Sequence, residues 1–223
     1  MKAALIFGAS RGIGHEFVRQ YRADGWRVLA TCRKAADVEA LQALGAEVHL
    51  LDVTDADGVI TLAGKLAAER FDVIVINAGV FPRGDDKPDA LDEASFLNGM
   101  RTNVLAPQRL IGLFGDHLNA SATLGVLSSQ MGSIGRTEGS NAMFYRATKA
   151  AVNMVIKAYA NAWQDGNKRI LALHPGWVKT DMGGAGAEID VATSVSGLRH
   201  VLAAGGMERN GGFFDYADEA LEW

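Results

Sequence analysis

Short and almost uninterrupted apolar segments alternate along the chain with longer segments of helical periodicity, and this alternation restricts the fold more than any other feature of the sequence. We predict strands at 3–7, 27–31, 47–50, 73–76, 123–127, 169–174 and 212–214. Most of these segments are apolar throughout, which is typical of parallel strands that are covered on both faces. Helices are predicted between them at 12–24, 36–44, 55–69, 92–118, 142–164 and 191–203.

This succession of strands and helices predicts an α/β fold, a doubly wound sandwich with a seven-stranded parallel sheet flanked by helices. The 223 residues fit a single domain with a large core, and no repeat, low-complexity tract or linker divides them. The helix predicted at 92–118 contains Gly99 and Pro107, so we expect a kink or bulge near Asn103. Such an interruption can place a functional group inward.

The composition narrows the class of protein. Hydrophobic residues make up 48% and charged residues 22% of the chain, and the formal net charge is −4, so nothing favours nucleic acid as a partner. No segment approaches the ~20 apolar residues that cross a bilayer. The single cysteine, Cys32, excludes an internal disulfide and is consistent with a reducing compartment. We therefore predict a cytoplasmic protein that binds neither nucleic acid nor membrane, and we find no metal-ligand spacing.

A glycine-rich segment, Gly8-Ala-Ser-Arg-Gly-Ile-Gly14, follows the first predicted strand directly and opens the first predicted helix. Glycines at such a turn let the backbone approach a pyrophosphate, and the helix directs its free N–H groups and the positive end of its dipole at the phosphates. A tight turn without a ligand is the alternative. The position between strand and helix favours a dinucleotide site.

The spacing Gly-x3-Gly-x-Gly resembles the glycine motif of the short-chain dehydrogenase/reductase family, with Phe7 where that family usually has threonine. The resemblance implies a Rossmann-type fold in which residues 1–223 form one dinucleotide-binding and catalytic domain. It places these loop residues at the cofactor: Gly8, Ser10, Arg11, Gly12, Ile13 and Gly14. The segment Met182-Gly-Gly and the ending from Gly212 further resemble the C-factor-like and carbonyl-reductase-like branches.

The end of the second predicted strand indicates which nicotinamide dinucleotide binds. An enzyme specific for NAD commonly has an acid there that binds the ribose 2′-hydroxyl. Here Arg33 and Lys34 follow the strand, and Arg11 lies in the glycine loop. Arg11 and Arg33 resemble the basic positions that hold the 2′-phosphate in NADP-preferring members of the family, with solvated surface arginines as the alternative. We therefore predict NADP, with NAD as the other choice.

Three further segments at the carboxyl ends of predicted strands, where open parallel sheets bind ligands, resemble cofactor-binding motifs of the family. Asp52-Val53 resembles the pair that contacts adenine, with a helix-start role for Asp52 as the alternative. Asn77-Ala78-Gly79, with Ile76 in place of the family's first asparagine, is expected beneath the adenine ribose. The segment after the sixth strand resembles Pro-Gly-x-Val-x-Thr and implies cofactor contacts from Pro175, Gly176, Val178 and Thr180.

Tyr145 and Lys149 are four residues apart in a predicted helix and so share one of its faces. A free phenol has a pKa of about 10 and is a poor acid–base catalyst at neutral pH. A nearby cation stabilises the phenolate. We therefore expect Lys149 to lower the pKa of Tyr145. The spacing alone is weak evidence, because Tyr-x3-Lys arises easily by chance.

Two other residues support the pair through the same resemblance. Ser129 follows the fifth predicted strand and matches the catalytic serine that hydrogen-bonds a substrate carbonyl; Ser128 is the weaker candidate, and turn chemistry is the alternative for both. Asn103 matches an asparagine that holds a water against the lysine in a proton relay, with a solvent-facing asparagine as the alternative. The implied catalytic residues are Ser129, Tyr145, Lys149 and Asn103. Tyr145 and Lys149 are also expected to contact the cofactor.

These residues predict an NADP-dependent oxidoreductase that reduces an aldehyde or ketone to an alcohol, with Tyr145 as the general acid. An NAD(P)-binding signalling or sensor protein with little turnover is the alternative, because C-factor-like relatives are associated with signalling. A hydrolase based on Ser129 lacks a nucleophile-elbow sequence. We also predict a homodimer, with the apolar face of 147–160 either in the core or against a second subunit. The expected rim of the substrate site, next to a short lid at 183–190, consists of Phe81, Gln130, Met131, Trp177 and Met182.

Overall fold

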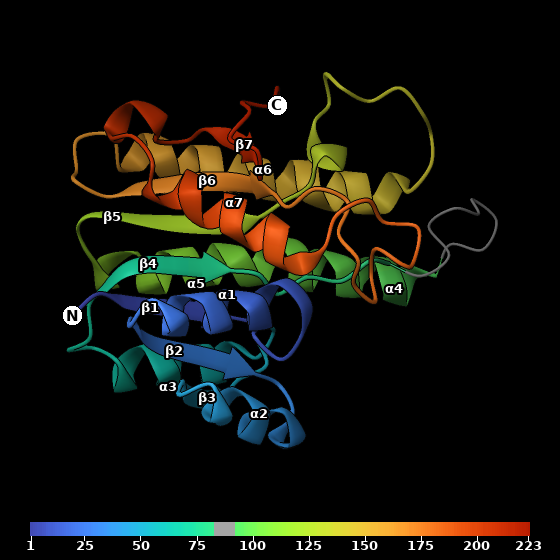
Figure 1. The fold of residues 1–223 in the computed structure, drawn as a ribbon. Coiled ribbons are helices and arrows are strands. Elements are labelled where there is room, and N and C mark those ends of the chain that lie inside the picture. Colours follow the sequence, from blue (N-terminus) through green and yellow to red (C-terminus); the bar gives the residue numbers. More distant parts are fainter. Residues whose placement is uncertain (83–91) are drawn as a thin grey trace.

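The computed structural model describes residues 1–82 and 92–223, and a seven-stranded sheet forms its centre (Figure 1). The strands are β1 (Ala3–Phe7), β2 (Arg27–Cys32), β3 (Glu47–Leu50), β4 (Phe71–Ile76), β5 (Leu118–Leu127), β6 (Arg169–His174) and β7 (Phe213–Asp215). Their order in the sheet is β3-β2-β1-β4-β5-β6-β7, and all neighbouring strands are parallel. The predicted α/β fold with seven parallel strands is confirmed.

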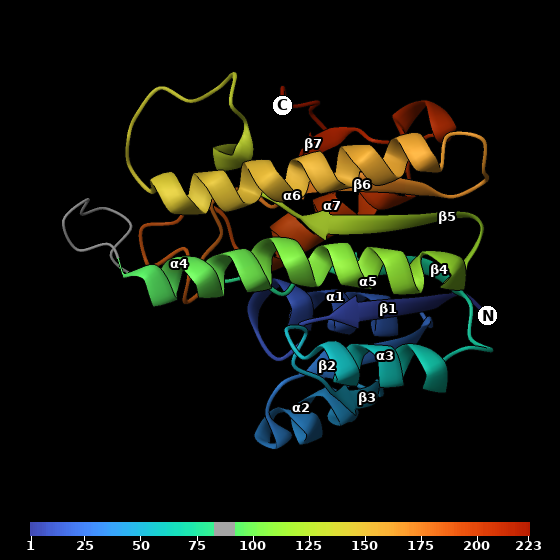
Figure 2. The ribbon, with the colours of Figure 1, turned by 180° about the vertical axis from the view of Figure 1, so that it is seen from behind.

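Helices cover both faces of this sheet. The face in front in Figure 1 carries α1 (Gly12–Ala23), α2 (Val38–Ala43) and α7 (Val191–Ala203). The opposite face, seen in Figure 2, carries α3 (Ala56–Lys65), α5 (Ala106–Phe114) and α6 (Met143–Ala162). The helix α4 (Glu93–Met100) continues through a π-helical turn (Arg101–Leu105) into α5. Within the two described ranges, no helix is long and apolar enough to cross a membrane.

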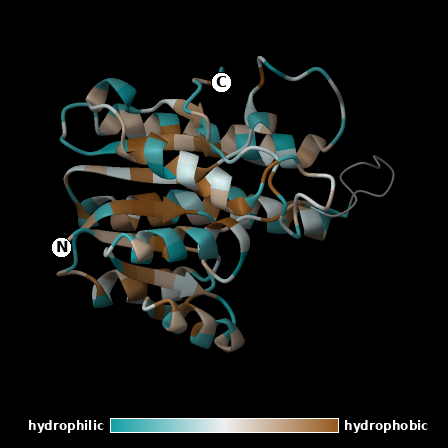
Figure 3. Cartoon of the chain, viewed as in Figure 1, coloured by the Kyte–Doolittle hydropathy of each residue, from teal (hydrophilic) through white to brown (hydrophobic). Residues whose placement is uncertain are grey.

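The core has two layers because successive strand side chains point to opposite faces of the sheet. In the layer under α5 and α6, Phe7 and Phe114 are fully buried and meet edge-on, with 4.9 Å between ring centroids. In the layer under α1 and α7, Phe17 packs beside Tyr21 at 6.1 Å. Burying each large apolar side chain contributes about 1.5–3 kcal/mol. Burial on both faces explains why the central strands are apolar along their length (Figure 3).

Several element boundaries differ from the prediction. The strand predicted at 123–127 begins already at Leu118, because Leu118 pairs with Phe71 of β4 ahead of a register shift, after which Thr123 pairs with Val73. The helix predicted at 55–69 ends at Lys65, where the chain turns back toward the sheet. The helix predicted at 92–118 is interrupted at Asn103 by the π-helical turn, as expected, and ends at Phe114. Secondary-structure propensity alone does not predict these boundaries, because packing against the sheet decides where an element begins or ends.

The strand order places a crevice at the carboxyl ends of β1 and β4. From β1 the chain moves outward to β2 and β3, whereas from β4 it moves in the other direction toward β7. The connections after β1 and β4 therefore cover opposite faces of the sheet, and they separate where the two strands end. Open parallel sheets bind ligands at such a switch point.

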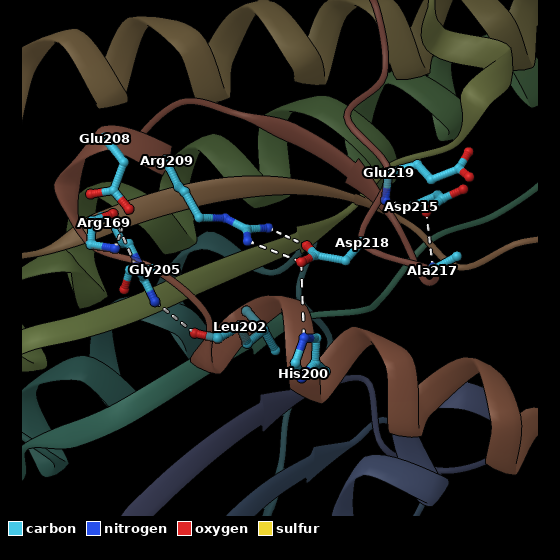
Figure 4. Close-up of polar contacts among 11 residues, drawn as sticks. Arg169, His200, Leu202, Gly205, Glu208, Arg209, Asp215, Ala217, Asp218 and Glu219 are labelled. Carbon is cyan, nitrogen blue, oxygen red and sulfur yellow. Dashed lines mark hydrogen bonds and ion pairs between the residues drawn. The ribbon is translucent and has the colours of Figure 1, made fainter.

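A polar network holds the C-terminal part of the chain beside α7 (Figure 4). Arg209 forms an ion pair with Asp218, and His200 of α7 lies 3.9 Å from the same carboxylate (Nε2 to Oδ2). Arg169 of β6 donates a hydrogen bond to the carbonyl oxygen of Leu202 at 3.0 Å. These contacts fasten the segment around β7 to α7 and β6.

Candidate active site

A cleft of about 560 Å³ lies at the carboxyl ends of the strands. It extends from the end of β2, past the glycine loop after β1, to the buried face of α6. The predicted site residues that line it are Gly8, Ser10, Arg11, Gly12, Ile13, Arg33, Asp52, Val53, Asn77, Ala78, Gly79, Tyr145, Lys149, Pro175 and Thr180. The predicted residues that do not line the cleft are Gly14, Asn103, Ser129, Gly176 and Val178.

The glycine loop needs its glycines for steric reasons. Gly8 has a φ of +83°, and a Cβ on Gly14 would lie 2.2 Å from the carbonyl oxygen of Gly8. The same oxygen accepts a hydrogen bond from Asn77 Nδ2 at 2.6 Å. The N–H of Gly8 donates to Thr31 Oγ1 at 3.1 Å, so a threonine of β2 braces the loop. Thr31 could not be recognised from the sequence, since a buried threonine in an apolar strand belongs to no motif.

The residues present fit a dinucleotide. Arg11 is the N-cap of α1 and makes no side-chain hydrogen bond to the helix. The first backbone bond of the helix runs from the N–H of His15 to the carbonyl of Arg11, so the N–H groups before it have no partner within the helix. Gly12 and Ile13, which carry two of these groups, line the cleft. An exposed helix start beside a glycine cradle suits a pyrophosphate.

The end of the cleft that lies away from α6 carries the groups expected around adenosine. Asp52 accepts two hydrogen bonds from Thr54, from the backbone N–H at 2.9 Å and from the hydroxyl at 2.7 Å. Burial by itself raises the pKa of Asp52. The two hydrogen bonds from Thr54, with Arg33 and Arg101 nearby, outweigh burial, so the pKa is lowered overall. Asp55 is the N-cap of α3, so Asp52 does not start that helix. Arg33 is exposed at the rim and carries its charge into the cleft.

Two segments meet across the middle of the cleft. Arg11 of the glycine loop forms an ion pair with Asp181, with 2.5 Å between Nη1 and Oδ2. Beneath the pair, a Cβ on Gly12 would come within 3.3 Å of Thr180 Cγ2. Both charged side chains are exposed, so the pair is screened by water and contributes little to stability. The pair joins the glycine loop to the segment after β6, and both of its members line the cleft.

Tyr145 and Lys149 lie on the buried face of α6, at the opposite end from Arg33. Lys149 Nζ donates a hydrogen bond to the carbonyl oxygen of Leu127 at 2.8 Å and lies 5.6 Å from the centroid of the Tyr145 ring. Ser129, at the end of β5, is hydrogen-bonded to the Tyr145 side chain. The backbone of Lys149 packs so closely on Gly132 that a Cβ there would be 2.8 Å away. The three side chains therefore meet at one place.

The neighbouring serines are held differently. Ser128 donates a hydrogen bond to Asn153 Oδ1 at 2.6 Å, so its hydroxyl is directed at α6. Ser129 is the N-cap of a short 3-10 helix (Gln130–Gly132), and its hydroxyl accepts from the N–H of Met131 at 3.1 Å. The structure thus places Ser129, and not Ser128, against Tyr145.

Asn103 is buried in the π-helical turn and clamps the loop after β4. Its Oδ1 accepts from the N–H of Val80, and its Nδ2 donates to the carbonyl of Val80, both at 2.9 Å. The amide also donates to Thr148 Oγ1 at 3.0 Å. Because both amide hydrogens are used within the protein, a relay water at this turn would have to bind a carbonyl oxygen.

The family profile described as short chain dehydrogenase matches residues 2–188. The chain belongs to the short-chain dehydrogenase family. The predicted resemblance, with its C-factor-like and carbonyl-reductase-like branch, is therefore confirmed.

Three similar proteins illustrate the range of this short-chain dehydrogenase's relatives. The 1-hydroxy-2-glutathionyl-2-methyl-3-butene dehydrogenase of Rhodococcus sp. (strain AD45) is 33% identical over 82% of this chain and 80% of its own length. C-signal of Myxococcus xanthus is 33% identical over 68% of this chain and 92% of its own. The structure of a carbonyl reductase from Pseudomonas aeruginosa PAO1 in complex with NADP superposes with a TM-score of 0.90, at 28% identity and full coverage of both chains.

The electrostatics of Tyr145 contradict one expectation. Burial raises the pKa of Tyr145 to about 12, and the hydrogen bond with Ser129 offsets this only in part. Burial also lowers the pKa of Lys149 to about 8. The predicted lowering of the Tyr145 pKa by Lys149 is therefore wrong for this structure, because loss of hydration dominates the pKa of both groups. The phenol is protonated at neutral pH.

The expected rim of the short-chain dehydrogenase site is partly apolar and partly open. Met182 lines the cleft and is half exposed. The indole of Trp177 is also half exposed, and its Nε1 donates to the carbonyl oxygen of Gly183 at 2.8 Å. The ring of Phe81 lies on the ring of Tyr145. Throughout the described residues, no three His, Cys, Asp or Glu side chains are grouped as a metal site requires.

Proposed function

We propose that this short-chain dehydrogenase reduces the carbonyl group of an aldehyde or ketone to an alcohol, with NADPH as the reductant. The observation that carries the proposal is the position of the Tyr145 side chain. It is hydrogen-bonded to Ser129 beside Lys149, and Tyr145 and Lys149 line the same cleft as the glycine loop. A general acid and a dinucleotide cradle therefore share one cavity.

The chain's own residues supply binding and proton transfer. A bound nicotinamide supplies a hydride to the carbonyl carbon. The hydroxyl groups of Ser129 and Tyr145 converge, so both can hydrogen-bond the carbonyl oxygen and orient it. As negative charge develops on that oxygen, Tyr145 donates its proton. Below about pH 8 Lys149 is a cation, and it then stabilises the phenolate that this step leaves.

The basic groups at the adenosine end support NADP as the cofactor. Arg33 and Arg11 line the cleft, and β2 ends at Cys32 without a carboxylate. A guanidinium offers several donors to a phosphate, whereas it gains much less from a ribose hydroxyl. The NADP complex of the Pseudomonas aeruginosa carbonyl reductase is consistent with this choice.

The activity is tested by following NADPH absorbance while the purified protein is mixed with a panel of aldehydes, ketones and quinones. Saturable oxidation of NADPH with at least one carbonyl compound is the expected result. Absence of turnover across the panel, with NADPH demonstrably bound, would contradict a reductase.

The cofactor choice is tested by the thermal stabilisation that each dinucleotide produces. We expect NADPH to raise Tm more than NADH does at equal concentration. Replacing Arg33→Ala should weaken NADPH binding by roughly tenfold, because charge-assisted hydrogen bonds contribute about 1.5–3 kcal/mol, and should leave NADH binding nearly unchanged. Stronger stabilisation by NADH would refute the assignment.

A second candidate function is a cofactor-binding signalling protein with little turnover. The similarity to C-signal over 68% of this chain favours it. Such a protein needs the dinucleotide cradle but has no use for a buried acid next to Ser129. The carbonyl panel separates the two functions, since only the reductase consumes NADPH in proportion to the carbonyl supplied.

We propose in addition that the protein is a cytoplasmic homodimer. Val152, Ile156 and Ala160 of α6 are in the core, whereas Met154 on the outer side of the helix is 69% exposed. Leu105 is 45% exposed as well, and it lines a shallow groove along α3, α5 and α6 that also includes Ile60 and Leu113. Light scattering of the purified protein, with twice the chain mass as the expected result, tests the dimer.

A further inference from the structure

Phe81 covers the ring that carries the reacting phenol. The centroids of the Phe81 and Tyr145 rings are 4.8 Å apart, with 33° between their planes. Phe81 itself remains 39% exposed, so its ring meets Tyr145 while part of the residue faces solvent. The contact is an aromatic pair, which attracts beyond the gain from burial alone.

The chain on either side of Phe81 is held in place. On the N-terminal side, Val80 is clamped by Asn103 through both its N–H and its carbonyl group. On the C-terminal side, buried Pro82 packs against α4, where a Cβ on Gly99 would lie 3.0 Å from Pro82 Cγ. The π-helical turn and α4 therefore fix Phe81 over Tyr145.

We propose that Phe81 is a positioning residue for Tyr145, holding the phenol in its orientation at the cleft and keeping bulk water away from it. The inference rests on the proposed reductase function, which it deepens by adding a residue that sets the state of the acid. It also gives Asn103 a role that needs no relay water, since Asn103 acts on Tyr145 through Val80 and Phe81.

Among the neighbours of Tyr145, Phe81 differs from Ser129 and Lys149 because it acts on the phenol purely by excluding water. Ser129, from the end of β5, hydrogen-bonds the phenol and lowers its pKa. Lys149, on α6, lies beside the same ring with its ammonium group directed at Leu127. Phe81 has neither charge nor hydrogen-bonding group, so its ring can act only by contact and by displacing water. Burial, the effect that dominates at Tyr145, is what this ring provides.

The test uses Phe81→Ala, with Phe81→Tyr as the variant that keeps the ring. Phe96→Ala is the matched control, because half-buried Phe96 of α4 also packs against an aromatic of α6, Phe144, at 5.2 Å, but not against Tyr145. The first readout is the ionisation of Tyr145, taken as the tyrosinate absorbance that disappears when Tyr145→Phe is added to each variant. The second readout is kcat and KM for a carbonyl substrate and for NADPH.

In Phe81→Ala we expect the pKa of Tyr145 to fall by about one unit, toward the value of a hydrated phenol. We expect kcat to fall by roughly tenfold or more with the KM for NADPH unchanged, because misplacement of a catalytic group lowers the rate steeply. Phe96→Ala should match the wild type in both readouts, and Phe81→Tyr should keep the wild-type titration of Tyr145, because it keeps the ring.

An unchanged Tyr145 titration in Phe81→Ala overturns the inference, even if the protein proves to be an active reductase. An equal change in Phe96→Ala also overturns it, because the effect would then come from general loosening of α4. If no carbonyl compound is reduced, the titration still decides the role of Phe81 while the proposed function fails.

Discussion

Lys149 is an unfavourable residue for stability at the place it occupies. It is nearly fully buried, its pKa is lowered to about 8 by that burial, and its ammonium group has the carbonyl of Leu127 as hydrogen-bond acceptor. A buried cation costs free energy unless it is paired. The chain thus accepts a local cost in order to hold a positive charge beside Tyr145.

This cost has a predictable pH dependence. Between about pH 8 and pH 10.5 the unfolded chain binds a proton at Lys149 that the folded chain has lost. The free energy of unfolding therefore increases as pH rises through this window. Relative to Lys149→Met, the wild type should gain up to about 3 kcal/mol across it, at about 1.4 kcal/mol per pH unit. Denaturant titrations of both proteins at several pH values measure the difference. Exposed Lys157 of the same helix is the control, and a pH-independent difference for Lys149→Met would refute the buried cation.

Residue chemistry was predictable from the sequence only in part. The spacing of Tyr145 and Lys149 placed both on one helix face, and the structure has them there. The direction of the Tyr145 pKa shift was wrong, because spacing reveals proximity but not the depth of burial. Thr31 was not identified, and Phe81 was predicted only as a residue of the substrate-site rim, since their contacts are with neighbours that are distant in the sequence.

At the scale of elements, the glycine loop and the start of α1 form one unit. Gly14 lies in the first turn of α1, where its missing side chain allows the helix to begin directly over Gly8. Asn77 of the neighbouring connection then reaches the carbonyl oxygen of Gly8. The loop therefore cannot change shape without moving the connection after β4.

Gly14→Ala tests this unit against Gly64→Ala. A Cβ at Gly14 would collide with the Gly8 carbonyl at 2.2 Å, so we expect a loss of about 1–3 kcal/mol in unfolding free energy and loss of NADPH binding. Gly64 lies inside α3 with nothing within 4 Å of its Cβ position, and alanine there should be neutral or up to about 1 kcal/mol stabilising. Thermal melts and NADPH fluorescence titrations measure both effects. Normal NADPH affinity in Gly14→Ala would show that the loop does not hold the phosphates.

The elements themselves were largely predictable. Continuous apolar segments located most of the strands, and Gly99 with Pro107 located the interruption at Asn103, which is a π-helical turn. The start of β5 was not predictable, since Asn119 and Ser121 do not look like strand residues and lie in the irregular stretch between the Leu118 and Thr123 pairs with β4. Local sequence identifies an element, and tertiary contacts decide where it begins.

At the scale of the whole molecule, the C-terminal network determines whether the edge of the sheet is fastened. Asp218 has a φ of +69°, and its carboxylate lies between Arg209 and His200. The hydrogen bond from Arg209 lowers the pKa of Asp218. The group is only 28% exposed, so its interaction is less screened than a surface pair.

Asp218→Asn isolates this charge, because asparagine tolerates the left-handed backbone conformation. We expect a loss of about 1–2 kcal/mol at neutral pH. Since the folded pKa of Asp218 is lowered, its contribution is present above the unfolded value of about 4 and disappears as pH falls through the folded value. Urea titrations of wild type and variant over the acid range measure it. A difference that persists in strong acid would mean that the charge is not the cause.

The topology of the molecule followed from the sequence because alternating strands and helices leave few arrangements with both sheet faces covered. The network around Asp218 did not follow from it, since Arg169, His200 and Arg209 are ordinary charged residues until the fold brings them together. The same holds for the Arg11–Asp181 bridge, whose members are 170 residues apart.

Comparison of Tyr145→Phe with the wild type tests the account most directly, because the change removes one hydroxyl and leaves the rest of the cleft intact. With NADPH and the best carbonyl substrate, kcat/KM should fall by about 10²–10⁴-fold, the usual contribution of a general acid. The dissociation constant for NADPH, measured on the same samples, should stay close to that of the wild type. Turnover near the wild-type rate in Tyr145→Phe would contradict the assignment of Tyr145 as the proton donor.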